Sequence, residues 1–66
     1  MKIADFVEWE LAHFRKECNF DSEESYFFER RAKNIPIEQI AEEMNISVGK
    51  ANKLSAKVKK KILKVI

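Results

Sequence analysis

The side chains best suited to chemistry in this 66-residue chain are lysines gathered near its C-terminus. Residues 47–66 contain seven lysines and no acidic residue. Residues 35–66 carry a formal charge of +4, from seven Lys against three Glu, whereas residues 1–34 carry −2, from six Lys or Arg against eight Asp or Glu. Such a split indicates a basic end that faces a polyanion. A solvated lysine face is the alternative, and charge alone does not separate the two.

No pattern of catalytic or metal-binding residues is evident in the sequence. His13 is the only histidine and Cys18 the only cysteine, which excludes an internal disulfide and a four-ligand Cys/His zinc site. The glutamates at 23–24 and 42–43 are adjacent in sequence, so their side chains diverge by about 100° on a helix and do not converge as an acid pair. We therefore expect no enzymatic activity, no metal and no cofactor.

The expected compartment is the cytoplasm. A single free thiol suits a reducing environment. No apolar run approaches the length of a membrane span, and the first ten residues, MKIADFVEWE, place acids where a signal peptide needs an apolar core. We expect no association with a membrane.

One glycine, one proline and abundant helix-forming residues predict a single all-α domain of four helices. Asp21 and Glu24 form a capping-box pattern, Pro36 suits a helix start and Ser47 is a strong N-cap. Asn34 is expected in a left-handed conformation after the second helix. The expected helices span residues 3–18, 22–33, 37–44 and 48–65.

The stretch IAEEMNIS, residues 40–47, predicts a helix-turn-helix. Two helices joined by about three residues must cross steeply. Ala41 is small, as the close approach of crossing helices requires, and Asn45 is expected to end its helix in a left-handed conformation. Ile46 is expected to fill the space between the helices before Ser47 caps the next one.

The long last helix is predicted to have two sides. Its apolar side comprises Ala51, Leu54, Val58, Ile62 and Val65. Roughly opposite are Lys50, Lys53, Lys57, Lys60, Lys61 and Lys64. Lys50 stands in the first turn, where the helix dipole disfavours a cation, and Gly49 beside it is a poor helix former. A phosphate ligand explains both, because glycine admits close approach and a helix N-terminus offers N–H groups to an anion.

Residues 20–62, FDSEESYFFERRAKNIPIEQIAEEMNISVGKANKLSAKVKKKI, resemble the DNA-binding domains of LuxR/GerE-type regulators and of sigma-factor region four. Phe20 precedes a capped helix, the pair at 40–41 opens a short scaffold helix, and the pair at 46–47 opens a basic recognition helix. The resemblance covers about two thirds of the chain and leaves residues 1–19 as an extra helix in front of a helix-turn-helix region.

The resemblance implies a sequence-specific DNA-binding protein, a transcriptional regulator, whose long last helix enters the major groove. The residues implied to face DNA are Ser47, Gly49, Lys50, Asn52, Lys53, Lys57 and Lys60. The Asn52 amide is the best candidate for reading adenine, because it can pair with both N6 and N7. Two departures are Asn34 in place of a usual glycine and Ala51 in place of a larger β-branched residue. Small stand-alone modules of this kind are frequent in phages and mobile elements.

The first helix carries two apolar stripes. The stripe expected to face the core comprises Ile3, Val7, Leu11, Phe14 and Cys18. The second stripe comprises Phe6, Trp9 and His13. This aromatic stripe either widens the contact with the core or forms a protein interface.

One recognition helix offers few base contacts, so we expect a homodimer on two half-sites of double-stranded DNA. Either the aromatic stripe or the tail ILKVI, residues 62–66, could build its two-fold interface. Two other functions stay open. A protein adaptor would bind RNA polymerase or another regulator through the aromatic stripe. A membrane-surface role would use the basic amphipathic last helix, although its apolar side is needed to cover the other helices.

Overall fold

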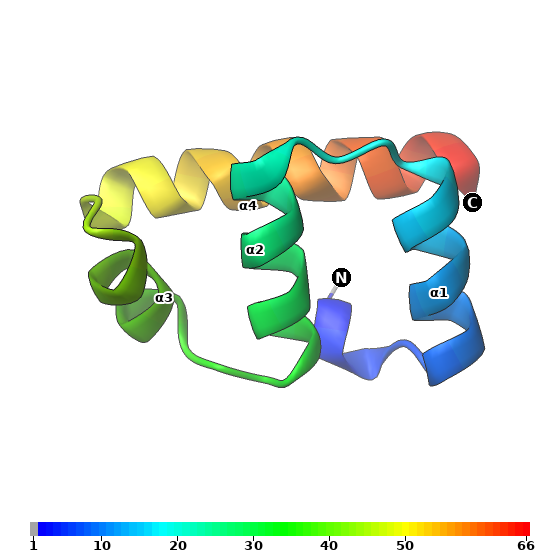
Figure 1. Cartoon of the computed structure of the whole chain (residues 1–66), viewed down its shortest axis with the longest axis horizontal. Helices are drawn as coiled ribbons and strands as arrows, with labels where there is room; N and C mark the ends of the chain where they lie inside the picture. The colour runs from blue at the N-terminus through cyan, green and yellow to red at the C-terminus, as the bar shows by residue number, and fades with distance from the viewer. Residues whose placement is uncertain (1) are drawn as a thin grey trace.

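The computed structural model describes residues 2–66, which form four α-helices and a short 3-10 turn, with no strand among them (Figure 1). The all-α prediction is confirmed. The longest helix runs along the molecule, two helices cross it, and the shortest lies beside its first turns (Figure 1). In chain order the elements are η1 (Ile3–Asp5), α1 (Glu8–Glu17), α2 (Ser22–Ala32), α3 (Ile37–Met44) and α4 (Val48–Val65).

α4 is the axis on which the other elements are assembled. Its 18 residues measure about 27 Å at a rise of about 1.5 Å per residue, against a long axis of 29 Å for the molecule. Within residues 2–66, no helix is at once long enough and apolar enough to span a lipid bilayer.

The hydrophobic core lies between α4 and the helices that cross it. Phe27 and Phe28 of α2 are fully buried, and the Phe28 ring meets that of Phe14 edge-on, with centroids 6.5 Å apart. The predicted apolar side of α4 faces this core and is confirmed by its burial. Its members Ala51, Leu54, Val58 and Ile62 are buried, and Val65 is half-buried.

The predicted first helix, residues 3–18, is wrong over its first turns. Ile3–Asp5 form the 3-10 turn η1, the chain is extended at Val7, and α1 begins only at Glu8. The backbone N–H of Val7 donates to Oε1 of Glu10 at 2.9 Å, which gives this N–H a partner where the helix starts. The new helix start is thus held by a local hydrogen bond.

Packing explains why the chain breaks before α1. Ile3 is 1% exposed, and the ring of Phe6 meets that of Phe14 edge-on with centroids 4.8 Å apart. Because the chain breaks before α1, the side chains of Ile3 and Phe6 reach the core from the segment that precedes this helix. Val7, which was expected on the inner stripe, is 53% exposed as a result.

The capping signals around α2 and α3 are confirmed. Oδ1 of Asp21 accepts from the backbone N–H of Glu24 at 2.8 Å, and Oε1 of Glu24 accepts from the N–H of Asp21 at 3.0 Å. Asn34 and Asn45 both adopt left-handed conformations, with φ of 62° and 57°. α2 ends one residue earlier than predicted.

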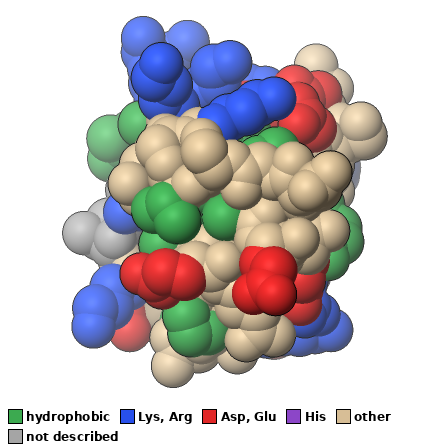
Figure 2. Space-filling model, turned by 90° about the vertical axis from the view of Figure 1, so that its left-hand side faces the viewer, with side chains coloured by type: hydrophobic (Ala, Val, Ile, Leu, Met, Phe, Trp, Pro, Cys, Tyr) green, Lys and Arg blue, Asp and Glu red, His purple; other side chains and the backbone are tan. Residues whose placement is uncertain are grey.

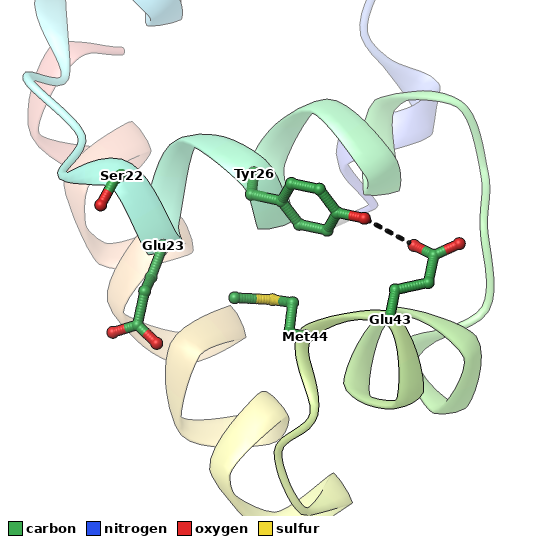
Figure 3. A pocket seen from close by; sticks show the side chains of 5 residues that line it. All are labelled: Ser22, Glu23, Tyr26, Glu43 and Met44. Atoms are coloured by element: carbon green, nitrogen blue, oxygen red, sulfur yellow. Dashed lines mark hydrogen bonds between the residues drawn. The ribbon is translucent and has the colours of Figure 1, made fainter.

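Polar contacts to Glu43 join α2 to α3 at the surface. Arg30 donates to its carboxylate through Nη2 at 2.7 Å and Nε at 2.9 Å, and the Tyr26 hydroxyl donates at 3.1 Å (Figure 3). The hydrogen bonds from Arg30, then those from Gln39 and Tyr26, hold the pKa of the Glu43 carboxyl below its ordinary value of 4.5. The ionised form of Glu43 therefore stabilises the α2–α3 contact.

We expect the Glu43 contact to make the fold less stable in acid. A carboxyl whose pKa is lower in the folded than in the unfolded chain stabilises the fold above its unfolded pKa, and this contribution is lost as the pH falls through its folded pKa. Glu43→Gln should therefore flatten the dependence of the melting temperature on pH between pH 7 and 3. Glu42→Gln, at an exposed neighbour, is the control. Identical pH profiles for the wild type and Glu43→Gln would contradict this prediction.

Candidate nucleic-acid interface

The candidate interface is the outward side of α4 together with the turn that precedes it. Burial of the apolar side against the core fixes the rotation of α4 about its axis, so the opposite side stays in solvent. The seven residues that the sequence assigns to DNA contact are all exposed: Ser47, Gly49, Lys50, Asn52, Lys53, Lys57 and Lys60.

The start of α4 is capped and carries no acidic residue. Oγ of Ser47 accepts from the backbone N–H of Lys50 at 3.1 Å, which confirms the predicted N-cap. The first turn of α4 contains no Asp or Glu. The N-terminal N–H groups of a helix have no intrahelical acceptor and favour an anion. This end of α4 is therefore electrostatically suited to an anionic ligand.

Gly49 is not required by the protein's own packing. A Cβ built on Gly49 would meet only Oγ of Ser47, at 3.9 Å, which is an ordinary contact. A glycine inside a helix costs roughly 0.5–1 kcal/mol relative to alanine. The fold thus carries this cost without a steric reason of its own, at the exposed start of the most basic helix.

The lysines lie along one flank of α4, away from its apolar side. At about 100° per residue, the row is centred about 120° around the axis from the apolar side. The row comprises Lys50, Lys53, Lys57, Lys60 and Lys64, all exposed. Figure 2 views the end of the molecule where α3 meets α4. Lysine and arginine side chains gather along the upper part of this face, with an acidic group beside them at the upper right, whereas acidic side chains lie across its lower middle with further basic side chains at the lower corners.

Lys61 does not belong to the exposed row, contrary to the sequence prediction. Its Nζ lies 2.5 Å from Oε1 of Glu24 and 3.4 Å from the carbonyl oxygen of Asn19. The Glu24 carboxylate is 3% exposed and Lys61 is 35% exposed. Lys61 therefore serves the fold, because it supplies the cation for a buried carboxylate.

The first lysines of the row border a hollow between α2 and α4. This hollow has a volume of about 320 Å³ and is lined by Glu23, Lys50, Lys53, Leu54 and Lys57. Among residues 2–66, none of these three lysines has a carboxylate within 4 Å. Their charge is left free for an external anion, and Glu23 is the one acid beside them in the hollow.

The lysine row on α4 borders an acidic neighbour, α3. Glu38 and Glu42 on α3 are exposed. A second hollow, of about 340 Å³, opens between α2 and α3, and Glu23 and Glu43 contribute to its lining (Figure 3). Met44 lies between these two acids in the same view. Glu43 is paired with Arg30, whereas Glu38 and Glu42 have no ion-pair partner among residues 2–66, so their carboxylates disfavour a polyanion across α3 relative to α4.

Sequence reasoning did not identify Ala56 as part of the interface. Ala56 follows Gly49 by seven residues, which is nearly two full turns, so both lie on the side of α4 most nearly opposite the core. Ala56 is also exposed. The sequence does contain the signal, because two small residues are spaced seven apart. Around the helix axis they lie between the lysine row and Asn52. A small side chain here lets the helix axis come close to a ligand surface.

The aromatic stripe of α1 divides between the core and the surface. Phe6 packs on the core, whereas Trp9 is 73% exposed and His13 is exposed. Trp9 and His13 line a groove of about 240 Å³ whose other wall includes Val65 and Ile66 at the end of α4. This α1–α4 groove exposes apolar side chains, Trp9 and Ile66 among them, and lies apart from the start of the lysine row.

The single cysteine is buried, whereas the single histidine, His13, is exposed. Cys18 is buried, and burial raises the pKa of its thiol. Within residues 2–66, no three His, Cys, Asp or Glu side chains come together in a way that could hold a metal ion.

The geometry of the lysine row suits a linear polyanion. Successive lysines are separated by three or four residues, or about 4.5–6 Å along the axis, and the row from Lys50 to Lys64 extends over about 21 Å. Double-stranded DNA carries about one negative charge per 1.7 Å of its axis.

Comparison of the chain with family models, curated proteins and solved structures finds no match.

Proposed function

We propose that this protein is a small sequence-specific binder of double-stranded DNA and a transcriptional regulator, with α4 in the major groove. An α-helix is about 10–12 Å across and the major groove about 12 Å wide, so a helix exposed along one side can enter. The observation that carries the proposal is the contrast among the lysines. Lys61 has a carboxylate partner, whereas the exposed row, headed by Lys50, Lys53 and Lys57, has none within the described chain.

Each part of the interface has a proposed role. The lysine row contacts phosphates on one strand and sets the register of the helix. Gly49 and the capped start of α4 allow close approach to a phosphate or a base edge. Asn52, on the other side of the Gly49–Ala56 line, reads adenine through a bidentate contact to N6 and N7. The resemblance to LuxR/GerE-type domains and sigma-factor region four supports the same orientation of this helix.

Selection from a pool of random duplex DNA tests the proposal. We expect the wild-type protein to enrich a short motif, arranged as an inverted repeat if two copies bind together. Asn52→Ala should still bind but should relax the preference at one adenine, since a bidentate contact contributes about 1–3 kcal/mol of discrimination. A pool without any enriched motif, from a protein that is folded by circular dichroism, would refute sequence-specific binding.

A second candidate function, a protein adaptor, is favoured by the exposure of Trp9. Aromatic side chains are enriched at the centres of protein interfaces, and Trp9 is the most exposed aromatic residue of the chain. In this alternative the α1–α4 groove binds RNA polymerase or another regulator. Binding to purified RNA polymerase that is lost with Trp9→Ala and kept with Lys53→Glu would favour the adaptor over the DNA-binding protein.

We expect Gly49→Ala to stabilise the fold and to weaken DNA binding. The added methyl group meets no steric obstacle and removes backbone freedom from the unfolded chain, so the free energy of unfolding should rise by about 0.5–1 kcal/mol. The same methyl group would hold the DNA surface away from the start of α4. Urea denaturation and fluorescence anisotropy with a labelled duplex measure the two effects. Unchanged or tighter DNA binding would show that Gly49 does not contact DNA.

Glu23→Gln should tighten DNA binding, because Glu23 is the acid beside Lys50, Lys53 and Lys57 in the α2–α4 hollow. Removing a negative charge next to bound phosphates should raise the affinity about threefold at low ionic strength, with a smaller gain at high salt. Asp5→Asn, which makes the same change of net charge at an exposed site in η1, away from the lysine row, is the control. Equal gains for the two variants would indicate an effect of net charge only.

A further inference from the structure

The α1–α4 groove and the end of the chain form one apolar surface. Trp9, Val65 and Ile66 line the groove together, with Trp9 73% exposed and Ile66 75% exposed. Leu63 lies three residues before Ile66 and is 64% exposed, and side chains three apart are neighbours on a helical surface. The two surfaces that the sequence offers separately for dimerisation are therefore continuous in the structure.

Charges of both signs border this apolar surface, and they come from different elements. Glu10 of α1 lines the groove, and Lys64 on α4 is exposed next to its Val65 wall. Neither side chain forms an ion pair with residues 2–66. A two-fold axis through the groove with suitable orientation would bring Glu10 of each copy toward Lys64 of the other. A surface that is complementary to itself in this way fits a second copy of the same chain.

The position of the groove also permits the spacing that a DNA dimer needs. Asn52 lies thirteen residues before Val65, or about 20 Å along the helix axis. Two copies that meet at the C-terminal ends of α4 therefore place their proposed reading positions up to about 40 Å apart. Half-sites one helical turn apart are centred about 34–36 Å from each other. The groove lies at the other end of α4 from Ser47, so it stays clear of the proposed DNA contacts from Ser47 to Lys57, and Lys64 is the one residue of the lysine row that borders it.

We infer that the α1–α4 groove, with Trp9 and Ile66 in its lining and the exposed Leu63 beside it, is the two-fold interface of a homodimer. The dimer itself rests on the surface and charge pattern, and its use in spacing two half-sites rests on the proposed DNA-binding function. Trp9 is the only tryptophan of the chain. Its fluorescence therefore reports on this surface alone.

Sedimentation and Trp9 fluorescence, measured over the same concentration range without DNA, test the interface. The mass should rise from that of one 7.8 kDa chain to that of two. The Trp9 emission should move to shorter wavelength over the same range, because the indole leaves water. A single-chain mass up to millimolar concentration would overturn the inference. A dimer whose Trp9 emission does not move would also overturn it, because its interface would lie elsewhere.

Two matched variants separate the interface from the fold and from DNA binding. Ile66→Asp should raise the dimer dissociation constant about tenfold or more, because it puts a charge into an apolar contact twice per dimer. Val48→Asp, which introduces the same charge at an exposed apolar site at the opposite end of α4, should leave it unchanged. Equal effects would refute the assignment. A wild-type dimer that binds no duplex would refute only the DNA function, and a single chain that binds DNA specifically would refute only the dimer.

Discussion

Replacing Lys50, Lys53 and Lys57 together by alanine should lower the affinity for duplex DNA about 100-fold or more at moderate salt. Each lysine is exposed and has no carboxylate partner among residues 2–66, so each is free to contact a phosphate. Hydrogen bonds to charged groups contribute about 1.5–3 kcal/mol each, and part of this is lost to the mobility of exposed side chains. The loss for three such contacts is therefore several kcal/mol.

The salt dependence gives this prediction its sharper form. Each phosphate contact contributes about 0.9 to the slope of log K against log salt concentration, so the triple variant should lose about 2.7 from that slope. The control removes the same net charge elsewhere, at the exposed lysines 2, 16 and 33. Fluorescence anisotropy with one labelled duplex at several salt concentrations measures both variants. Equal slopes for the two would show that net charge, and not the row on α4, attracts DNA.

Lys60→Ala and Lys61→Ala should affect different properties, although the two residues are adjacent. Lys61→Ala should lower the stability of the fold, and Lys60→Ala should weaken DNA binding. Lys61→Ala leaves the carboxylate of Glu24, which is 3% exposed, without its cation, and should lower the free energy of unfolding by about 1–3 kcal/mol. In a domain of this size each kcal/mol lowers the melting temperature by about 4–8 °C. Asp21 keeps its hydrogen bond to the Glu24 backbone in this variant, so α2 remains capped.

Lys60→Ala should change the unfolding free energy by no more than about 0.5 kcal/mol, because Lys60 is exposed. Its proposed role is a phosphate contact, so the slope of log K against log salt should fall by about 0.9. Thermal denaturation and DNA titration of both variants form a two-by-two comparison. A loss of stability for Lys60→Ala equal to that for Lys61→Ala would contradict the division of the lysines between fold and ligand.

The elements marked by local chemistry were predictable from the sequence. Asp21 and Glu24 satisfy each other's backbone N–H groups, so the start of α2 depends on four consecutive residues. Asn45 and Ser47 similarly end α3 and begin α4 within a three-residue turn. The apolar side of α4 follows from its 3.6-residue period. Such signals are contained in short segments, and tertiary packing did not override them.

The parts that the sequence did not predict depend on contacts between distant segments. The apolar spacing of residues 3, 7 and 11 fits a continuous helix, yet Ile3 and Phe6 pack better when the chain breaks before α1. Lys61 looks like one more member of a lysine row, and its partner Glu24 lies 37 residues away. The α1–α4 groove likewise joins Trp9 to Ile66 at the other end of the chain. The periodicity of apolar residues shows which side of a helix is apolar, but it does not show which other segment packs against that side.

The most direct test is to map where duplex DNA contacts the folded protein. We expect random-sequence duplex, added to ¹⁵N-labelled protein at low ionic strength, to shift the amide resonances of Ser47, Gly49, Asn52 and Lys53. The Trp9 indole resonance should not respond when duplex is added to protein that is already dimeric. A spectrum that does not change on adding duplex, or changes confined to Trp9 and His13, would contradict the assignment of α4 as a DNA-binding helix.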